Sequence, residues 1–122
     1  MTRAILDEGV PRMLAGLLSN HGSDASPFPN EWKRLSDRDV IAAADMTGFD
    51  VPITCDRNMP FPCALRDRRI AVLVLPFSRL DAVLGSVEAI SSRLLALEAG
   101  RYALLGREGS LPLHPRKPLE GS

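Results

Sequence analysis

Residues 70–75 read IAVLVL, six consecutive apolar side chains with no polar residue among them. A strand with one face in water alternates apolar and polar residues, whereas a strand covered on both faces does not. Strands covered on both faces belong to parallel sheets with helices packed on each side. This run therefore predicts an α/β fold with a buried strand.

The rest of the chain alternates short apolar runs with segments of helical periodicity. In the segment from residue 80 to about 100, apolar residues recur at i, i+3, i+4 and i+7, which predicts the longest helix of the chain. Alternating strands and helices imply right-handed βαβ units, so we predict a three-layer α/β/α sandwich with a mainly parallel central sheet. The expected strands are residues 3–6, 24–28, 49–54, 70–75 and 101–105, and the expected helices are residues 10–20, 36–48 and 80–100.

A chain of 122 residues has the usual size of one domain. We expect this domain to cover residues 1–110, followed at 111–122 by a short strand and a poorly ordered, proline-containing tail. The 15 basic and 15 acidic residues leave no formal net charge. The chain therefore lacks the strong general field of a nonspecific nucleic-acid binder, and a polyanionic partner must be held locally.

Cys55 and Cys63 are the only cysteines, too few for a disulfide-dense scaffold or a four-ligand zinc site. We expect them to be reduced thiols. The chain shows no apolar run of the kind that a signal peptide needs, and none of the about 20 residues that a membrane span needs. These features predict a cytoplasmic protein without membrane contact.

Acidic residues follow two of the expected strands. Asp7 comes directly after residues 3–6, Asp56 comes shortly after residues 49–54, and Asp37 opens the helix that Ser36 can cap. In an open parallel sheet, ligand sites form outside the carboxyl ends of the strands. If the first and third strands are neighbours, all three carboxylates can gather there, and oxygen ligands suit Mg²⁺ or Mn²⁺.

Each acid also has a purely structural explanation. Asp7 and Glu8 can favour the amino end of the following helix, and Asp37 is favourable in a first helical turn for the same electrostatic reason. Asp39 fits a capping box with Ser36. Asp56 and Asn58 are residue types that make local hydrogen bonds in turns.

Three motifs carry a resemblance to a known family. ILDEGVP at residues 5–11, SDRDV at 36–40 and ITCDRNM at 53–59 resemble, in order and spacing, the motifs of the small PIN-like domains of bacterial toxin-antitoxin modules. The resemblance covers residues 3–105. It implies a metal-dependent ribonuclease toxin in which Asp7, Asp37 and Asp56 hold Mg²⁺ or Mn²⁺. It also implies a cognate antitoxin as partner, and a homodimer as a further option.

The chain departs from the family pattern at Asn58, where the family usually carries another Asp. The Asn58 carbonyl oxygen can still ligate a metal, but with one negative charge fewer the cluster should bind metal more weakly. The fourth acidic ligand stays open among Glu8, Glu31 and Asp39.

An active site of this kind would hydrolyse RNA phosphodiester bonds. Phosphate contacts supply most sequence-independent affinity for a nucleic acid, and single-stranded RNA is the favoured substrate. The candidate RNA-binding residues are Lys33, Arg34, Arg66, Arg68 and Arg69.

Two alternatives to the nuclease remain. One is a noncatalytic module of the same fold that pairs with an antitoxin-like partner, and the uncharged Asn58 favours it. The other is a receiver-like phosphoacceptor domain, which also has acids at the ends of its first and third strands. Against it, the run at 70–75 is followed by PFSR, without the lysine that receivers carry after a late strand.

Overall fold

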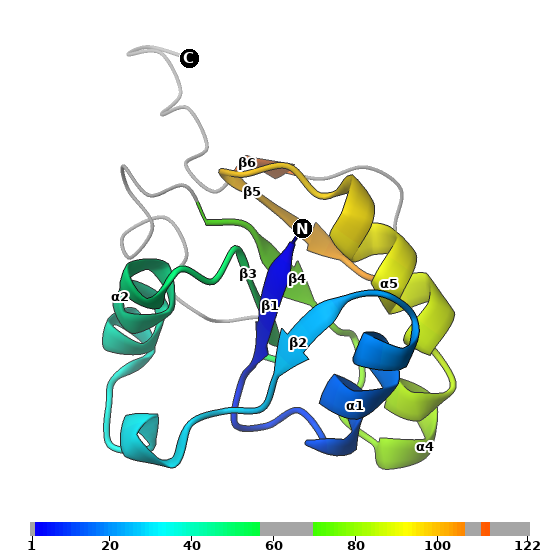
Figure 1. Cartoon of the computed structure of the whole chain (residues 1–122), viewed down its shortest axis with the longest axis horizontal. Coiled ribbons are helices and arrows are strands. Elements are labelled where there is room, and N and C mark those ends of the chain that lie inside the picture. The colour runs from blue at the N-terminus through cyan, green and yellow to red at the C-terminus, as the bar shows by residue number, and fades with distance from the viewer. Residues whose placement is uncertain (1, 57–69, 107–110, 113–122) are drawn as a thin grey trace, which may run out of the picture.

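A computed structural model describes residues 2–56, 70–106 and 111–112 of the chain (Figure 1). Within these residues, one sheet has the strand order β2-β1-β3-β4-β5-β6. The first five of these strands are mutually parallel, and β6 is antiparallel to β5. The strands are β1 (Arg3–Leu6), β2 (Asp24–Ser26), β3 (Val51–Thr54), β4 (Val72–Val74), β5 (Arg101–Leu104) and β6 (Leu111–Pro112).

Helices cover both faces of the sheet. Helix α2 packs on one face, whereas α1, α4 and α5 lie together on the other (Figure 1). This arrangement confirms the predicted α/β fold with three layers. The helical elements are α1 (Met13–Asn20), the 3₁₀ turn η1 (Asn30–Trp32), α2 (Asp37–Thr47), α4 (Leu80–Leu84) and α5 (Val87–Ala96).

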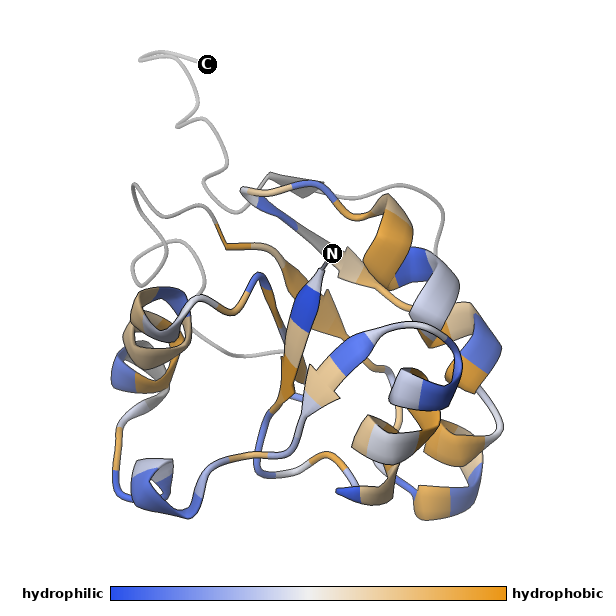
Figure 2. Cartoon of the chain, viewed as in Figure 1, coloured by the Kyte–Doolittle hydropathy of each residue, from blue (hydrophilic) through white to orange (hydrophobic). Residues whose placement is uncertain are grey.

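The apolar run at residues 70–75 is buried along its whole length, as predicted. Its side chains alternate between two hydrophobic cores: Ile70, Val72 and Val74 join the core beneath α2, and the intervening residues join the larger core beneath α1, α4 and α5. Figure 2 shows the central strands coloured mainly as hydrophobic, with hydrophilic residues recurring along the helices and loops. Burial on both faces explains why this strand shows no alternation of polar and apolar residues.

The prediction of a single long helix from residue 80 to about 100 is wrong, because this segment forms two helices, α4 and α5. The break is at Gly85 and Ser86, where the Ser86 amide donates to the Val83 carbonyl at 3.1 Å and the Ser86 hydroxyl donates to the Ala82 carbonyl at 2.9 Å. Glycine and serine both favour non-helical backbone, and serine does so by binding nearby carbonyls. The apolar periodicity continues across the break because both helices face the same core.

Other boundaries differ by a few residues. Helix α1 begins at Met13, so Val10 is buried in the preceding turn and does not belong to the helix. The second strand ends at Ser26, and η1 was not predicted. The short strand expected after residue 110 exists as β6, while residues 57–69 and 113–122, with the expected proline-rich loop and tail, lie outside the described residues. Among the described helices, none is both long enough and apolar enough to cross a membrane.

The end of α2 depends on Gly48, which has a φ of 91°, in the left-handed region. A Cβ at this position would also lie 3.0 Å from Nη1 of Arg3. We expect Gly48→Ala to lower the free energy of unfolding by about 1–2 kcal/mol, since a non-glycine residue is strained there. Urea unfolding measures this change.

Gly16 provides the matched control for this substitution. It lies inside α1, and a Cβ there would meet no atom within 4 Å. Gly16→Ala should therefore stabilise the protein by about 0.5–1 kcal/mol, because alanine loses less conformational entropy in a helix. Equal effects of the two substitutions would contradict the role assigned to the Gly48 backbone.

Candidate active site at the carboxyl ends of β1 and β3

The strand order reverses direction between β1 and β3. From β1 the chain first adds β2 on one side, and then β3, β4 and β5 follow on the other. In doubly wound sheets, loops diverge at such a switch point and leave a crevice at the carboxyl ends of the two strands. Asp7 and Asp56 both follow these strands, so the fold places the two predicted acids at its most favourable location for a ligand.

Asp7 is held against the end of β3 by its backbone. Ala4, Ile5 and Leu6 pair with residues 51–53 in register, and the Asp7 amide continues the pairing by donating to the Ile53 carbonyl at 2.8 Å. The Asp7 side chain is half-buried. The first and third strands are therefore neighbours, as the predicted site requires.

Thr54 connects the two acids. Its hydroxyl donates to Oδ2 of Asp7 at 2.9 Å and accepts a hydrogen bond from the Asp56 amide at 3.0 Å. The Thr54 side chain is fully buried, at 0% exposure. Thr54 was not predicted from the sequence. Its only signal was a polar residue at the end of an otherwise apolar strand, and its partner Asp7 is 47 positions away.

Cys55 lies beside this network. Its thiol donates to the Phe77 carbonyl at 3.3 Å. Burial, and in second place the negative charge of Asp7, raise the pKa of the Cys55 thiol above its ordinary value. Cys55 therefore stays a neutral thiol near pH 7, and neutral thiols are poor nucleophiles and poor metal ligands.

The remaining predicted ligands are Asp37 and Asn58. Asp37 is the first residue of α2, but its side chain is outside what the structure describes, as is all of Asn58. The predicted cap of α2 is confirmed, because the Ser36 hydroxyl accepts from the Asp39 amide at 3.2 Å. Within the described residues, no three His, Cys, Asp or Glu side chains form a metal-binding group. The convergence of Asp37 on Asp7 and Asp56 thus stays a prediction.

A pocket of about 280 Å³ opens beside the turn that follows Asp7. The turn after β1 forms part of its wall. In this turn the Val10 amide donates to the Asp7 carbonyl at 3.0 Å, and Val10 lines the pocket. Lys33, a predicted RNA-binding residue, lies in this pocket, and Arg34 follows it on an exposed turn. The described residues that line the pocket are Glu8, Val10, Arg12, Phe28 and Lys33. Arg12 was not predicted, because only the fold brings it to the same pocket as Lys33. Arg66, Arg68 and Arg69 lie outside the described residues.

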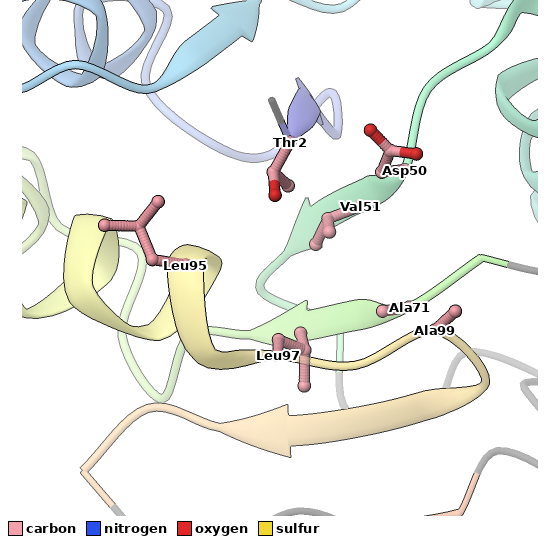
Figure 3. A pocket seen from close by; sticks show the side chains of 7 residues that line it. All are labelled: Thr2, Asp50, Val51, Ala71, Leu95, Leu97 and Ala99. Carbon is pink, nitrogen blue, oxygen red and sulfur yellow. The ribbon is translucent and has the colours of Figure 1, made fainter.

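A second pocket, of about 370 Å³, lies at the opposite edge of the sheet (Figure 3). Asp50 stands at its rim above Val51, while Leu95 and Leu97 from the end of α5 form its apolar wall. Oδ2 of Asp50 accepts a hydrogen bond from the Arg3 amide at 2.8 Å. This pocket sits at the amino ends of the strands, where parallel sheets do not place their chemistry.

Thr54→Val tests the connection between the two acids. Valine has the shape of threonine but no hydroxyl, so the part-buried Asp56 amide loses its acceptor and the Asp7 carboxylate loses its donor. We expect the free energy of unfolding to fall by about 1–3 kcal/mol, as measured in urea. Thr54→Ser retains the hydroxyl and should restore part of the loss; a serine variant no better than valine would show that the hydroxyl is unimportant.

The Cys55 thiol reports the charge of Asp7. In a Cys63→Ser background, the alkylation rate of Cys55 should rise with pH about a midpoint above the ordinary thiol value of about 8.5, since only the thiolate reacts. Asp7→Asn removes a negative charge that opposes thiolate formation, so the midpoint should move down while burial keeps it above the ordinary value. An unchanged midpoint would mean that Asp7 is not charged beside Cys55.

The described site thus offers two acidic residues joined by a buried hydroxyl, with a partly cationic pocket beside the turn that follows Asp7. Oxygen ligands and nearby cations suit the binding of a divalent metal and a phosphate group. No match to this chain was found in a scan against protein-family models, in a search of curated proteins or in a search of solved structures.

Proposed function

We propose that this protein is a metal-dependent ribonuclease that hydrolyses single-stranded RNA at the carboxyl ends of β1 and β3. The observation that carries the proposal is the Thr54 hydroxyl, which ties Asp7 to the segment bearing Asp56 at the switch point of the sheet. The resemblance of the three motifs to PIN-like toxins supports the same reaction.

The chemistry of the donors fits Mg²⁺ or Mn²⁺. Carboxylate oxygens are hard ligands, and the thiol of Cys55, which lies between Thr54 and Asp56 in the chain, is kept protonated. Asp7 and Asp56 are the residues that would hold the ion, and Asp37 and Asn58 complete the proposed ligand set. When bound, such an ion lowers the pKa of a coordinated water and neutralises charge on the scissile phosphate.

The protein's own residues have distinct tasks in this proposal. Thr54 is a positioning residue, because its hydrogen bond fixes the orientation of the Asp7 carboxylate. Asp7 and Asp56 carry negative charge that repels an RNA phosphate, and a bound divalent ion would neutralise that repulsion for the phosphate next to it. Lys33 and Arg34, both exposed near this edge, contact the phosphate backbone. Arg66, Arg68 and Arg69 are proposed for the same task from the sequence alone.

The partners proposed from the resemblance are a cognate antitoxin and a second copy of the chain. A toxin of this kind would arrest growth when expressed alone and would be neutralised by a protein that covers the carboxyl edge. The proposed setting is the cytoplasm, where RNA substrates are found.

The direct test uses purified protein and a labelled set of mixed-sequence single-stranded RNAs, incubated with Mn²⁺, Mg²⁺ or excess EDTA. We expect shortened RNA only in the samples with metal. A protein that leaves all the RNAs intact at every metal concentration, while its thermal unfolding shows a folded domain, would contradict the ribonuclease and favour the noncatalytic binding module.

The strand order gives a second candidate some support. The order β2-β1-β3-β4-β5 is that of flavodoxin-like folds, which include phosphoacceptor domains with an acid after β3. In that case Asp56 would accept a phosphoryl group from a small phosphodonor. The described residues after β5, Leu105 and Gly106, again lack the lysine of receivers. Incubation with acetyl phosphate and Mg²⁺, followed by measurement of the intact mass, distinguishes the phosphoacceptor from the ribonuclease. A gain of one phosphoryl group that Asp56→Asn abolishes would favour the receiver-like domain.

A further inference from the structure

We propose that the pocket beside the turn that follows Asp7 is a subsite for one ribonucleotide of the RNA strand. This inference rests on the proposed function, since it concerns the strand that is cleaved there. The pocket is lined by Glu8, Val10, Arg12, Phe28 and Lys33 and measures about 280 Å³. This volume lies just below the about 300–1,000 Å³ range of ligand pockets, which suits a single nucleotide unit better than a larger ligand.

The rim of the pocket has the charges for a phosphodiester. Arg12 and Lys33 are both exposed and come from separate parts of the chain, the start of α1 and the end of η1. Among the described residues that line the pocket, Arg12 and Lys33 are cationic and Glu8 is the one carboxylate, so these lining residues carry a net positive charge. In a chain with no net charge overall, this local excess is what a polyanion requires. A guanidinium and an ammonium group are the usual partners of backbone phosphates.

The floor of the pocket is apolar and preformed. Val10 is 3% exposed and Phe28 is 8% exposed, so both are fixed by the packing around them. The Phe28 ring meets the Trp32 ring edge to face at 6.2 Å between centroids, and Trp32 meets Phe49 in the same way at 6.4 Å. Such a row of edge-to-face contacts holds the Phe28 ring in place. A ribose or base resting on this floor would lose little entropy to reorganisation of the protein.

Glu8 gives the subsite its preference for RNA. Its exposed carboxylate accepts hydrogen bonds only, and the ribose 2′-hydroxyl is a donor that DNA lacks. Glu8 immediately follows Asp7, so a nucleotide in the pocket places an adjoining phosphodiester near the proposed metal-binding acids. The pocket therefore selects the sugar and positions the strand, and the acids act on the neighbouring phosphate.

The test measures binding without metal, so that cleavage is not involved. Fluorescein-labelled hexauridylate is titrated with the full chain in EDTA at low salt, for wild type and for Arg12→Gln, Lys33→Gln and the double variant. We expect the dissociation constant to rise about tenfold in the double variant, and the slope of log affinity against log salt to become shallower by about 0.7 for each cation removed. Arg93→Gln, in the last turn of α5 at the opposite edge, is the matched control and should bind as wild type does.

Glu8→Ala tests the sugar preference, because alanine has no side-chain acceptor for the 2′-hydroxyl. The ratio of affinities for hexauridylate and hexadeoxyuridylate should fall toward one, while thermal unfolding stays unchanged because Glu8 is exposed. If the variants weaken hexauridylate binding as expected but metal never produces cleavage, the subsite stands and the ribonuclease fails. If metal-dependent cleavage occurs but Arg12→Gln with Lys33→Gln alters neither the dissociation constant nor KM, the ribonuclease stands and the subsite is overturned.

Discussion

Asp7→Asn should reduce metal-dependent RNA cleavage at least about 100-fold, equivalent to about 2.7 kcal/mol of transition-state stabilisation. Asn keeps an oxygen that can accept the Thr54 hydrogen bond, so the fold should persist. It removes the negative charge that a divalent cation requires, and one carboxylate can contribute several kcal/mol to such a site. The measurement is the single-turnover cleavage rate at saturating Mn²⁺, with thermal unfolding as the check on folding.

Glu88→Gln is the control for the loss of one negative charge. Glu88 is exposed in the first turn of α5, on the face of the sheet covered by α1, and it does not belong to the proposed ligand set. The Glu88→Gln variant should cleave RNA at the wild-type rate. Equal rates for Asp7→Asn, Glu88→Gln and wild type would show that the carboxyl end of β1 takes no part in the reaction.

Leu73→Ala should lower the free energy of unfolding by about 2–5 kcal/mol, a large part of the about 5–15 kcal/mol that stabilises a typical domain. Leu73 is fully buried in β4 and pairs in register with Ile53 on β3 and Ala103 on β5. Truncating it removes apolar contacts and leaves a cavity in the larger core, which cannot collapse because strands flank it on both sides. Chemical unfolding of the two proteins measures the difference.

Leu95→Ala deletes the same atoms at a surface position. Leu95 is 73% exposed on α5, so its truncation should change the free energy of unfolding by less than about 0.5 kcal/mol. A loss at Leu73 no greater than at Leu95 would mean that β4 is not the buried strand described above.

Most of the fold could be predicted because its signals are local. The unbroken apolar run at residues 70–75 requires burial on both faces, and Ser36 and Gly48 mark the two ends of α2 by their own capping chemistry. The division of residues 80–96 into α4 and α5 could not be predicted from periodicity. Both helices face one core, so their apolar pattern is continuous, and only the backbone bonds around Gly85 and Ser86 reveal the break.

The site could be predicted only in part. Asp7 and Asp56 follow strands, and the rule for carboxyl edges brings them together once β1 and β3 are neighbours. Thr54 and Arg12 were missed because their importance depends on partners far along the chain, Asp7 for the first and Lys33 for the second. The polar residue type of Thr54 at the end of an apolar strand was a signal, but residue type and spacing do not identify the partner in such a contact.

Binding of Mn²⁺ is the measurement that tests the central claim most directly, because the proposed reaction requires a metal at the carboxyl ends of β1 and β3. Calorimetric titration should be run on wild type, Asp7→Asn, Asp56→Asn and Glu88→Gln. We expect wild type and Glu88→Gln to bind Mn²⁺ alike, and each of the other two variants to bind at least about tenfold more weakly. Equal Mn²⁺ affinity in all four proteins, or no binding by wild type, would contradict the proposed site.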